Sequence, residues 1–152
     1  LIHTVFGGWA VGSILTISSL TPFSATVQGN PANTGTQGVV QRPDVVGPAY
    51  EGTRTLQRDF NVAAFARPAN FTYGSAGRNI LRGRPIFNWD FSALKEFALV
   101  ERLRLQFRFE AFALTNTPRF GQPGNVLGTA NFGVITSADT PRNLQFALKL
   151  VW

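Results

Sequence analysis

The chain has neither cysteine nor methionine, and its only histidine is His3. Without cysteine it forms no disulfide framework and no thiolate metal site, so its stability must come from packing and backbone pairing. Around one histidine we expect neither a serine triad nor a multi-histidine metal site, and His3 is interpreted as an ordinary residue of the terminal segment. The sequence therefore predicts no catalytic, cofactor-binding or metal-binding residues, and we expect no enzyme activity.

Long hydrophobic runs are also missing. No stretch of about 18 apolar residues is present, which excludes a transmembrane helix. The first residues lack the basic leading segment of a signal peptide. The absence of methionine suggests either a processed product or a piece of a longer chain.

Charge is scarce and unbalanced. Only 14% of the residues are charged, whereas a soluble domain has roughly a quarter. The net charge is +6, but the arginines are spread singly through the chain, so we expect no nucleic-acid partner. The arginines are expected to form ion pairs with internal carboxylates, or to contact an acidic lipid layer or a surface polysaccharide. The 14 Phe, 15 Gly and 9 Pro favour strands joined by turns.

Two stretches near the carboxyl end alternate strictly between apolar and polar residues. In LRLQFRFEAFALT, one parity is apolar and the other is polar, which is the pattern of a strand with one buried and one wet face. The predicted apolar strand face is Leu103, Leu105, Phe107 and Phe109. NLQFALKLVW repeats this alternation. The pattern is typical of a membrane β-barrel, although the edge of a soluble sandwich alternates in the same way.

The predicted fold class is all-β, with antiparallel strands, long extracellular-type loops and an incomplete barrel or sheet that other chains or copies complete. We predict one β domain over residues 1–152, with strands at about 9–27, 86–97, 102–115 and 143–152 and long loops at 28–85 and 116–142. The short connection at 98–101 predicts a hairpin. Apolar islands at 60–65 and 71–73 predict that the first loop folds back on a surface.

Several motifs add a family resemblance. AGRNILRG, RLRLQFRFEAF followed by NTPRFGQP, and the final QFALKLVW are its most specific pieces, and the similarity covers nearly the whole chain. The sequence resembles the carboxyl-terminal β-barrel region of TonB-dependent outer-membrane receptors and transporters, most closely the Oar-like branch with a carboxypeptidase-regulatory-like amino-terminal domain. The plug domain, the energy-coupling box and most of the roughly twenty-two strands have no counterpart here, so the resemblance does not imply substrate uptake by this chain alone.

The resemblance and the pattern together single out further residues. The resemblance implies that barrel-assembly machinery reads a terminal signature, and this signature comprises Phe146, Leu148, Leu150 and Trp152. The candidates for an interfacial aromatic belt are Trp9, Trp89 and Trp152, with ordinary core packing as the alternative. Internal ion pairing is expected to join Asp90 or Glu110 to Arg104 or Arg108 across strands, which favours a structural role over acid–base chemistry.

The small number of strands is the main constraint on function. A bacterial barrel needs at least about eight strands, and the sequence predicts about four. Open sheet edges in lipid leave backbone groups unpaired, at several kcal/mol each, so other strands must complete the sheet. The favoured hypothesis is a non-enzymatic structural protein, derived from the end of a TonB-dependent-transporter barrel, that assembles through its strand edges into an oligomer or extracellular filament.

The alternative is the carboxyl-terminal barrel segment of an outer-membrane TonB-dependent transporter. The expected partners are accordingly other copies of the chain or the remainder of a larger barrel, with the outer membrane or surface polysaccharide as a further contact. Both hypotheses place the protein at the bacterial cell surface, in an extracellular filament or in the outer membrane.

Overall fold

The computed structural model describes residues 6–35 and 40–152, and His3 lies outside them. The chain is all-β as predicted, and the residues described form no closed barrel. No helix in this part of the chain is long and apolar enough to cross a membrane. The elements in order are β1 (Trp9–Ser18), β2 (Pro22–Phe23), β3 (Thr26–Val27), β4 (Asp44–Val45), the single 3-10 turn η1 (Val62–Ala64), β5 (Phe65–Ala66), β6 (Leu81–Arg82), β7 (Ile86–Val100), β8 (Leu103–Phe112), β9 (Val126–Leu127) and β10 (Asn143–Val151).

The chain divides into two compact units. Unit 1 comprises Leu1–Ser18, Ile86–Arg119 and Asp139–Trp152, and unit 2 comprises Ser19–Pro85 and Phe120–Ala138. The division has a physical reason. Unit 2 has a hydrophobic core of its own, and most residues of that core come from the segments predicted as long loops.

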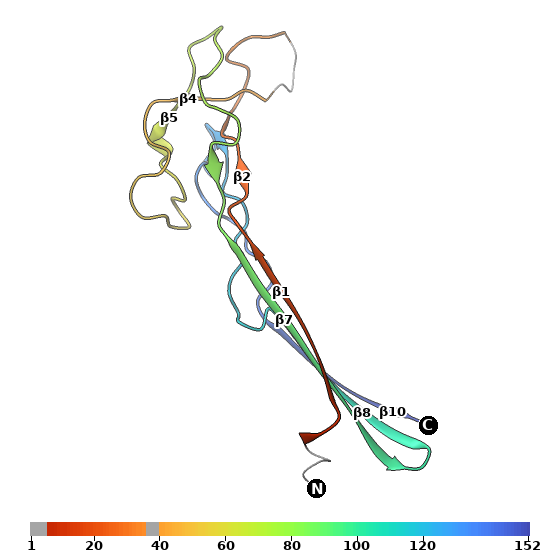
Figure 1. Ribbon diagram of the computed structural model, residues 1–152. Coiled ribbons are helices and arrows are strands. Elements are labelled where there is room, and N and C mark those ends of the chain that lie inside the picture. The colour runs from red at the N-terminus through yellow and green to blue at the C-terminus, as the bar shows by residue number, and fades with distance from the viewer. Residues whose placement is uncertain (1–5, 36–39) are drawn as a thin grey trace. The chain divides into compact units, whose positions relative to one another are not determined.

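Unit 1 is one antiparallel sheet with strand order β1-β7-β8-β10 (Figure 1). β1 pairs with β7 from Trp9↔Lys95 to Ser18↔Ile86, and β8 pairs with β10 from Phe112↔Asn143 to Arg104↔Val151. β7 and β8 form the predicted hairpin, joined by a tight turn at Glu101–Arg102 after an irregularity between Ala98 and Val100. The segments of unit 2 are connected to the sheet at the end of β1, the start of β7, the end of β8 and the start of β10.

The strand boundaries differ from the prediction where the backbone changes direction. The segment predicted as one strand over 9–27 stops at Ser18 and continues as the two short strands β2 and β3. The strand predicted at 102–115 stops at Phe112, because Ala113 adopts a φ of 51° that a strand does not accommodate. The strand predicted at 86–97 extends to Val100, and the last strand runs over Asn143–Val151.

Unit 2 is built from short pairs of strands and turns. β2 pairs with β6 and β4 with β5 in antiparallel fashion, whereas β3 and β9 are parallel. The residues predicted to be loops are therefore ordered by pairing between distant segments. Sequence periodicity does not reveal such pairing, because each strand is only two residues long.

The core of unit 2 is aromatic. Phe60, Phe65 and Phe132 contact one another edge to face, with ring centroids 5.1 to 5.8 Å apart, and Phe23 lies 6.3 Å from Phe60. Leu81 is fully buried beside this cluster. The apolar island at 60–65 was expected to fold back on a surface. Its residues Phe60, Ala64 and Phe65 are buried in this core.

A buried carboxylate adjoins the core. Asp59 is completely buried and accepts hydrogen bonds from Arg54 Nη2 at 2.6 Å and Arg84 Nε at 2.9 Å. The Asp59 amide donates to the Gly133 carbonyl at 2.8 Å and joins the two segments of unit 2. Two guanidinium groups therefore compensate the single buried charge, which is the condition for tolerating a carboxylate in a core.

Asp59→Asn is expected to lower the free energy of unfolding of unit 2 by about 2–3 kcal/mol, because both arginines lose the charge that they neutralise. Urea-dependent proteolysis of unit 2 measures this change. The control is Asp139→Asn in unit 1, since Asp139 pairs with Arg119 at 3.0 Å through side chains that are 58% and 34% exposed. Loss of this exposed pair is expected to change the stability by less than about 0.5 kcal/mol. Equal effects of the two substitutions would contradict the role assigned to Asp59.

Candidate functional site

The register of the unit 1 sheet separates its side chains into two chemically different faces. Residues opposite each other in an antiparallel pair point to the same face, and successive residues point to opposite faces. The apolar face comprises Trp9, Val11, Ser13, Leu15 and Ile17 of β1, Phe87, Trp89, Phe91, Ala93, Lys95 and Phe97 of β7, Leu103, Leu105, Phe107, Phe109 and Ala111 of β8, and Leu144, Phe146, Leu148 and Leu150 of β10.

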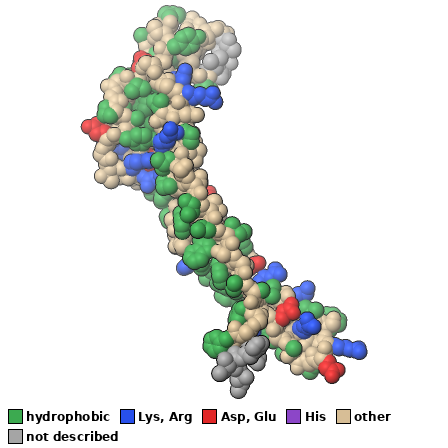
Figure 2. All heavy atoms as spheres, viewed as in Figure 1, with side chains coloured by type: hydrophobic (Ala, Val, Ile, Leu, Met, Phe, Trp, Pro, Cys, Tyr) green, Lys and Arg blue, Asp and Glu red, His purple; other side chains and the backbone are tan. Residues whose placement is uncertain are grey.

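Apart from Trp152, which follows the last strand, all residues of the predicted apolar strand face, the terminal signature and the aromatic belt lie on this apolar face. Many of its side chains are open to the surroundings, including Val11 at 70%, Phe146 at 68% and Leu148 at 69% exposure. Figure 2 shows hydrophobic side chains gathered along the sheet of unit 1. A contiguous apolar surface of this kind requires lipid or another protein surface to cover it.

Aromatic rings connect the strands across the apolar face. Trp9 contacts Phe107 edge to face at 6.1 Å, and Phe109 contacts Phe146 at 5.1 Å between ring centroids. The Trp89 indole N–H donates to Ser13 Oγ at 2.6 Å. Ser13 thus satisfies a donor that would otherwise be exposed on an apolar surface.

Lys95 is the one charged residue among the described members of the apolar face, and the sequence analysis missed it. It is only 2% exposed, and its Nζ donates to the Gly7 carbonyl at 2.8 Å. The same nitrogen lies 5.1 Å from the ring centroids of both Trp9 and Phe97. These contacts compensate the ammonium charge on a face that has no other charge. The sequence does contain a sign of this position, because Lys95 is two residues from Phe97 and alternation places both side chains on the same face of the strand.

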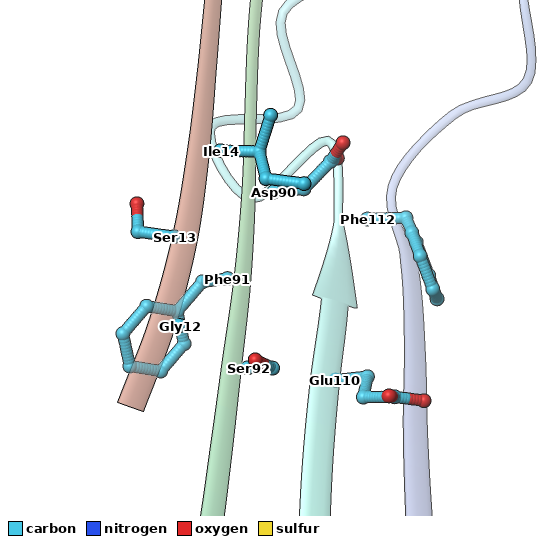
Figure 3. A pocket seen from close by; sticks show the side chains of 8 residues that line it. All are labelled: Gly12, Ser13, Ile14, Asp90, Phe91, Ser92, Glu110 and Phe112. Carbon is cyan, nitrogen blue, oxygen red and sulfur yellow. The ribbon is translucent and has the colours of Figure 1, made fainter. Parts of the chain in front are cut away.

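The opposite side of the sheet is the polar face. Its hydrogen-bonding and charged members are Thr16, Asn88, Asp90, Ser92, Glu96, Arg104, Gln106, Arg108, Glu110, Gln145 and Lys149. A hollow of about 250 Å³ opens over this face, lined in part by Asp90, Glu110 and Phe112 (Figure 3). Gly12 leaves room in its floor, since a Cβ there would lie 2.8 Å from Ser92 Oγ.

Ion pairing on the polar face differs from the prediction. Arg104 pairs across strands with Glu96 at 3.6 Å, and Arg108 lies 3.9 Å from Glu110 on its own strand. Asp90 forms no cross-strand pair with either arginine. The register places Ser92, not Asp90, opposite Glu110, so the arginines of β8 lie farther along the strand.

Asp90 instead accepts hydrogen bonds at the end of the β7–β8 pair. Its Oδ1 accepts a hydrogen bond from the Ala113 amide and its Oδ2 accepts one from Asn88 Nδ2, both at 2.9 Å. Ala113 is the residue at which the chain turns out of β8, so the carboxylate satisfies an amide that the sheet no longer pairs. Within 6–35 and 40–152, no group of three or more His, Cys, Asp or Glu residues is arranged to hold a metal ion.

A sheet with strands of membrane-spanning length, one largely apolar face and one polar face is typical of the wall of a transmembrane β-barrel. The chain belongs to the outer membrane beta barrel domain family, whose family model matches residues 1–145. It is therefore an outer-membrane β-barrel protein. Comparison with curated proteins and with solved structures gave no match.

Proposed function

We propose that this chain forms part of the wall of a TonB-dependent-transporter-type barrel in the bacterial outer membrane and has a structural, non-enzymatic role. The observation that supports this most directly is the continuous apolar face backed by a polar face. An arrangement of this kind separates lipid from an aqueous lumen. The terminal motifs resemble those of TonB-dependent transporters, which supports the finer assignment.

Strand length supports a membrane location. β1 and β8 have 10 residues each and β10 has 9. A tilted strand needs about 9–11 residues to cross the hydrocarbon core. β7 has 15 residues and extends into the hairpin that it forms with β8. A short turn at one end and long segments at the other are typical of these barrels, which assigns the hairpin to the periplasm and unit 2 to the outside.

The stagger of the strands supports a tilted barrel wall. At the hairpin end, Trp9 is level with Phe107 of β8, whereas Trp152 follows Val151, the partner of Arg104, and so comes level with Leu103. The first residues of β1 and the last of β10 are thus offset by about four residues over three strand-to-strand steps. At about 3.3 Å per residue and 4.8 Å per step, this offset corresponds to a tilt of roughly 40°, as in membrane barrels.

The three tryptophans lie towards the two ends of the strands. Trp9 begins β1 and Trp152 follows the last residue of β10, both at the hairpin end, whereas Trp89 lies six positions before Lys95, the partner of Trp9, along β7. Indole rings prefer the two boundaries of a membrane, because the ring is apolar and its N–H is polar. These positions, and the exposure of Trp9, Trp89 and Trp152 at 44%, 37% and 91%, favour the aromatic belt over ordinary core packing.

Assembly between copies is the second candidate. β1 and β10 are the two outer strands of the sheet, and each has one edge that no described residue pairs. Open edges are templates for strand addition. In lipid these edges must be paired, either by further strands of a longer polypeptide or by neighbouring copies.

Cysteine cross-linking separates the two candidates, and the chain contains no cysteine that would interfere. β1 and β10 are three strand spacings apart, about 14 Å, which is too far for a disulfide within one sheet. Thr16→Cys is combined in turn with Gln145→Cys, Ala147→Cys and Lys149→Cys, and non-reducing gels of membranes are compared. The barrel proposal predicts no disulfide-linked multimers and a single-polypeptide ring of strands by electron cryomicroscopy. A ladder of linked copies would support the filament and contradict the barrel.

A further inference from the structure

Two aromatic side chains of unit 2 are held away from its core. Phe71 and Tyr73 are each 74% exposed, although Phe60, Phe65 and Phe132 of the same unit are buried. Both belong to the segment that follows β5, which lies beside the segment preceding β4 in Figure 1. Two strongly exposed aromatic side chains separated by one residue form a candidate surface for contact with a ligand.

The segment that presents these rings is fixed on both sides. The Phe71 amide donates to the Pro31 carbonyl at 2.7 Å, and Thr72 Oγ1 donates to the Ala69 carbonyl at 2.7 Å. Gly74 packs so closely on the Arg42–Pro43 backbone that a Cβ would lie 2.0 Å from the Arg42 carbonyl oxygen. A rigid surface loses little conformational entropy when it binds a ligand.

Asp44 and Ser75 fasten the same segment through reciprocal hydrogen bonds. The Ser75 amide donates to Asp44 Oδ1 at 2.8 Å, and the Val45 amide donates to Ser75 Oγ at 3.0 Å. The Ala76 amide adds a bond to the Pro43 carbonyl at 2.9 Å. The segment that carries the two rings is therefore ordered by hydrogen bonds to a neighbouring segment.

The backbone at Phe71 is strained. Its φ is 64°, in the left-handed region that glycine and asparagine adopt most easily. A bulky aromatic residue in this conformation lowers stability, and no buried contact offsets this, because the ring is exposed. Because the strained backbone at Phe71 brings no gain in packing, we interpret its conformation as serving a function.

The charge of unit 2 indicates the chemistry of the ligand. Seven of the charged residues are arginines, namely Arg42, Arg54, Arg58, Arg67, Arg78, Arg82 and Arg84, against the three acids Asp44, Glu51 and Asp59. The buried Asp59 pairs with Arg54 and Arg84, so these three residues together contribute one positive charge, and the unit remains net positive. Arg42 is exposed, and its backbone contacts Gly74, the neighbour of Tyr73.

We propose that Phe71, Tyr73 and Arg42 form a binding site for an acidic saccharide, a sugar chain with carboxylate groups. The rings stack on the apolar faces of the sugar rings, and the guanidinium group pairs with a carboxylate. The site itself is a property of unit 2. Its encounter with a cell-surface polysaccharide rests on the proposed function, which places unit 2 outside the cell.

The test uses outer-membrane vesicles containing the full polypeptide and fluorescent oligogalacturonate as the probe. Phe71→Gly and Tyr73→Ala are each expected to weaken binding by about tenfold or more, as for anchoring aromatic residues. Tyr73→Phe retains the ring and is expected to bind within about twofold of the wild type. Arg42→Gln is expected to weaken binding and reduce its salt dependence, whereas Arg42→Lys retains part of both.

Phe71→Gly also separates a binding role from a structural one. Glycine relieves the strained backbone, so this variant is expected to unfold at a temperature equal to or above that of the wild type while it binds less oligogalacturonate. Neutral maltodextrin of equal length is expected to bind at least about tenfold more weakly than the acidic probe. Equal binding of the two sugars, unchanged binding by both ring variants, or no binding above that of vesicles without the protein would each overturn the proposal.

Discussion

Phe146→Lys is expected to prevent most of the protein from inserting stably into the outer membrane. Phe146 lies in the middle of β10 on the apolar face, where its ring contacts that of Phe109. A lysine facing lipid costs about 2–4 kcal/mol near the bilayer midplane, a factor of roughly 30 to 1,000 in the folding equilibrium. The measurement is urea-induced unfolding of the protein in lipid vesicles, together with the amount found in outer-membrane fractions.

The neighbouring residue provides the matched control. Gln145 lies one position away on the polar face, directly opposite Glu110. Gln145→Lys introduces the same ammonium group beside a carboxylate in an aqueous environment, so its effect is expected to stay within about 0.5 kcal/mol. If the two lysine variants were equally stable, or if Gln145→Lys were the more damaging, the assignment of the faces would be wrong.

Phe60→Ala is expected to open the core of unit 2. Phe60 is 3% exposed and contacts the rings of Phe23, Phe65 and Phe132. Replacing a buried phenylalanine with alanine costs about 3–5 kcal/mol, through lost contacts and the cavity that remains. Hydrogen exchange at the Asp59 and Ala76 amides, both of which are hydrogen bonded within unit 2, is expected to accelerate by about two to four orders of magnitude.

Phe71→Ala is the control for this substitution, because it removes the same side chain from a position that is 74% exposed. It is expected to change the stability of unit 2 by less than about 0.5 kcal/mol. A comparable loss in both variants would show that the aromatic cluster around Phe60 does not determine the stability of unit 2.

The sheet of unit 1 was largely predictable from the sequence, because alternation has a direct geometric cause. Leu103, Leu105, Phe107 and Phe109 were placed on one face by period alone, and the structure has them there. The hairpin was predictable from the short connection between two alternating runs. The end of β8 was not, since the left-handed backbone at Ala113 has no sequence signal comparable to glycine.

Unit 2 was the least predictable part. Its segments at 19–85 and 120–138 pair through strands of two residues, and a pair of residues has no period. The buried network of Asp59 with Arg54 and Arg84 joins residues whose proximity depends on tertiary folding. The sequence predicted only that the apolar residues near Phe60 would pack against some other part of the protein.

On the polar face, the sequence identified the charged residues but not their partners. A shift of two positions in register decides whether Asp90 or Ser92 lies opposite Glu110, and composition does not determine register. Residue type alone did not predict a role for Lys95, because its significance comes from its position on the apolar face, where its Nζ lies near the rings of Trp9 and Phe97.

The most direct test of the account is the pattern of lipid accessibility along β10. Single cysteines introduced one at a time from Leu144 to Leu150 carry spin labels, and collision rates with oxygen and with a water-soluble nickel complex are measured in membranes. Labels at Leu144, Phe146, Leu148 and Leu150 are expected to favour oxygen, and labels at Gln145, Ala147 and Lys149 to favour nickel, with a period of two residues. Uniform access to nickel at all seven positions, or an alternation of the opposite phase, would contradict the claim that this sheet is a membrane wall.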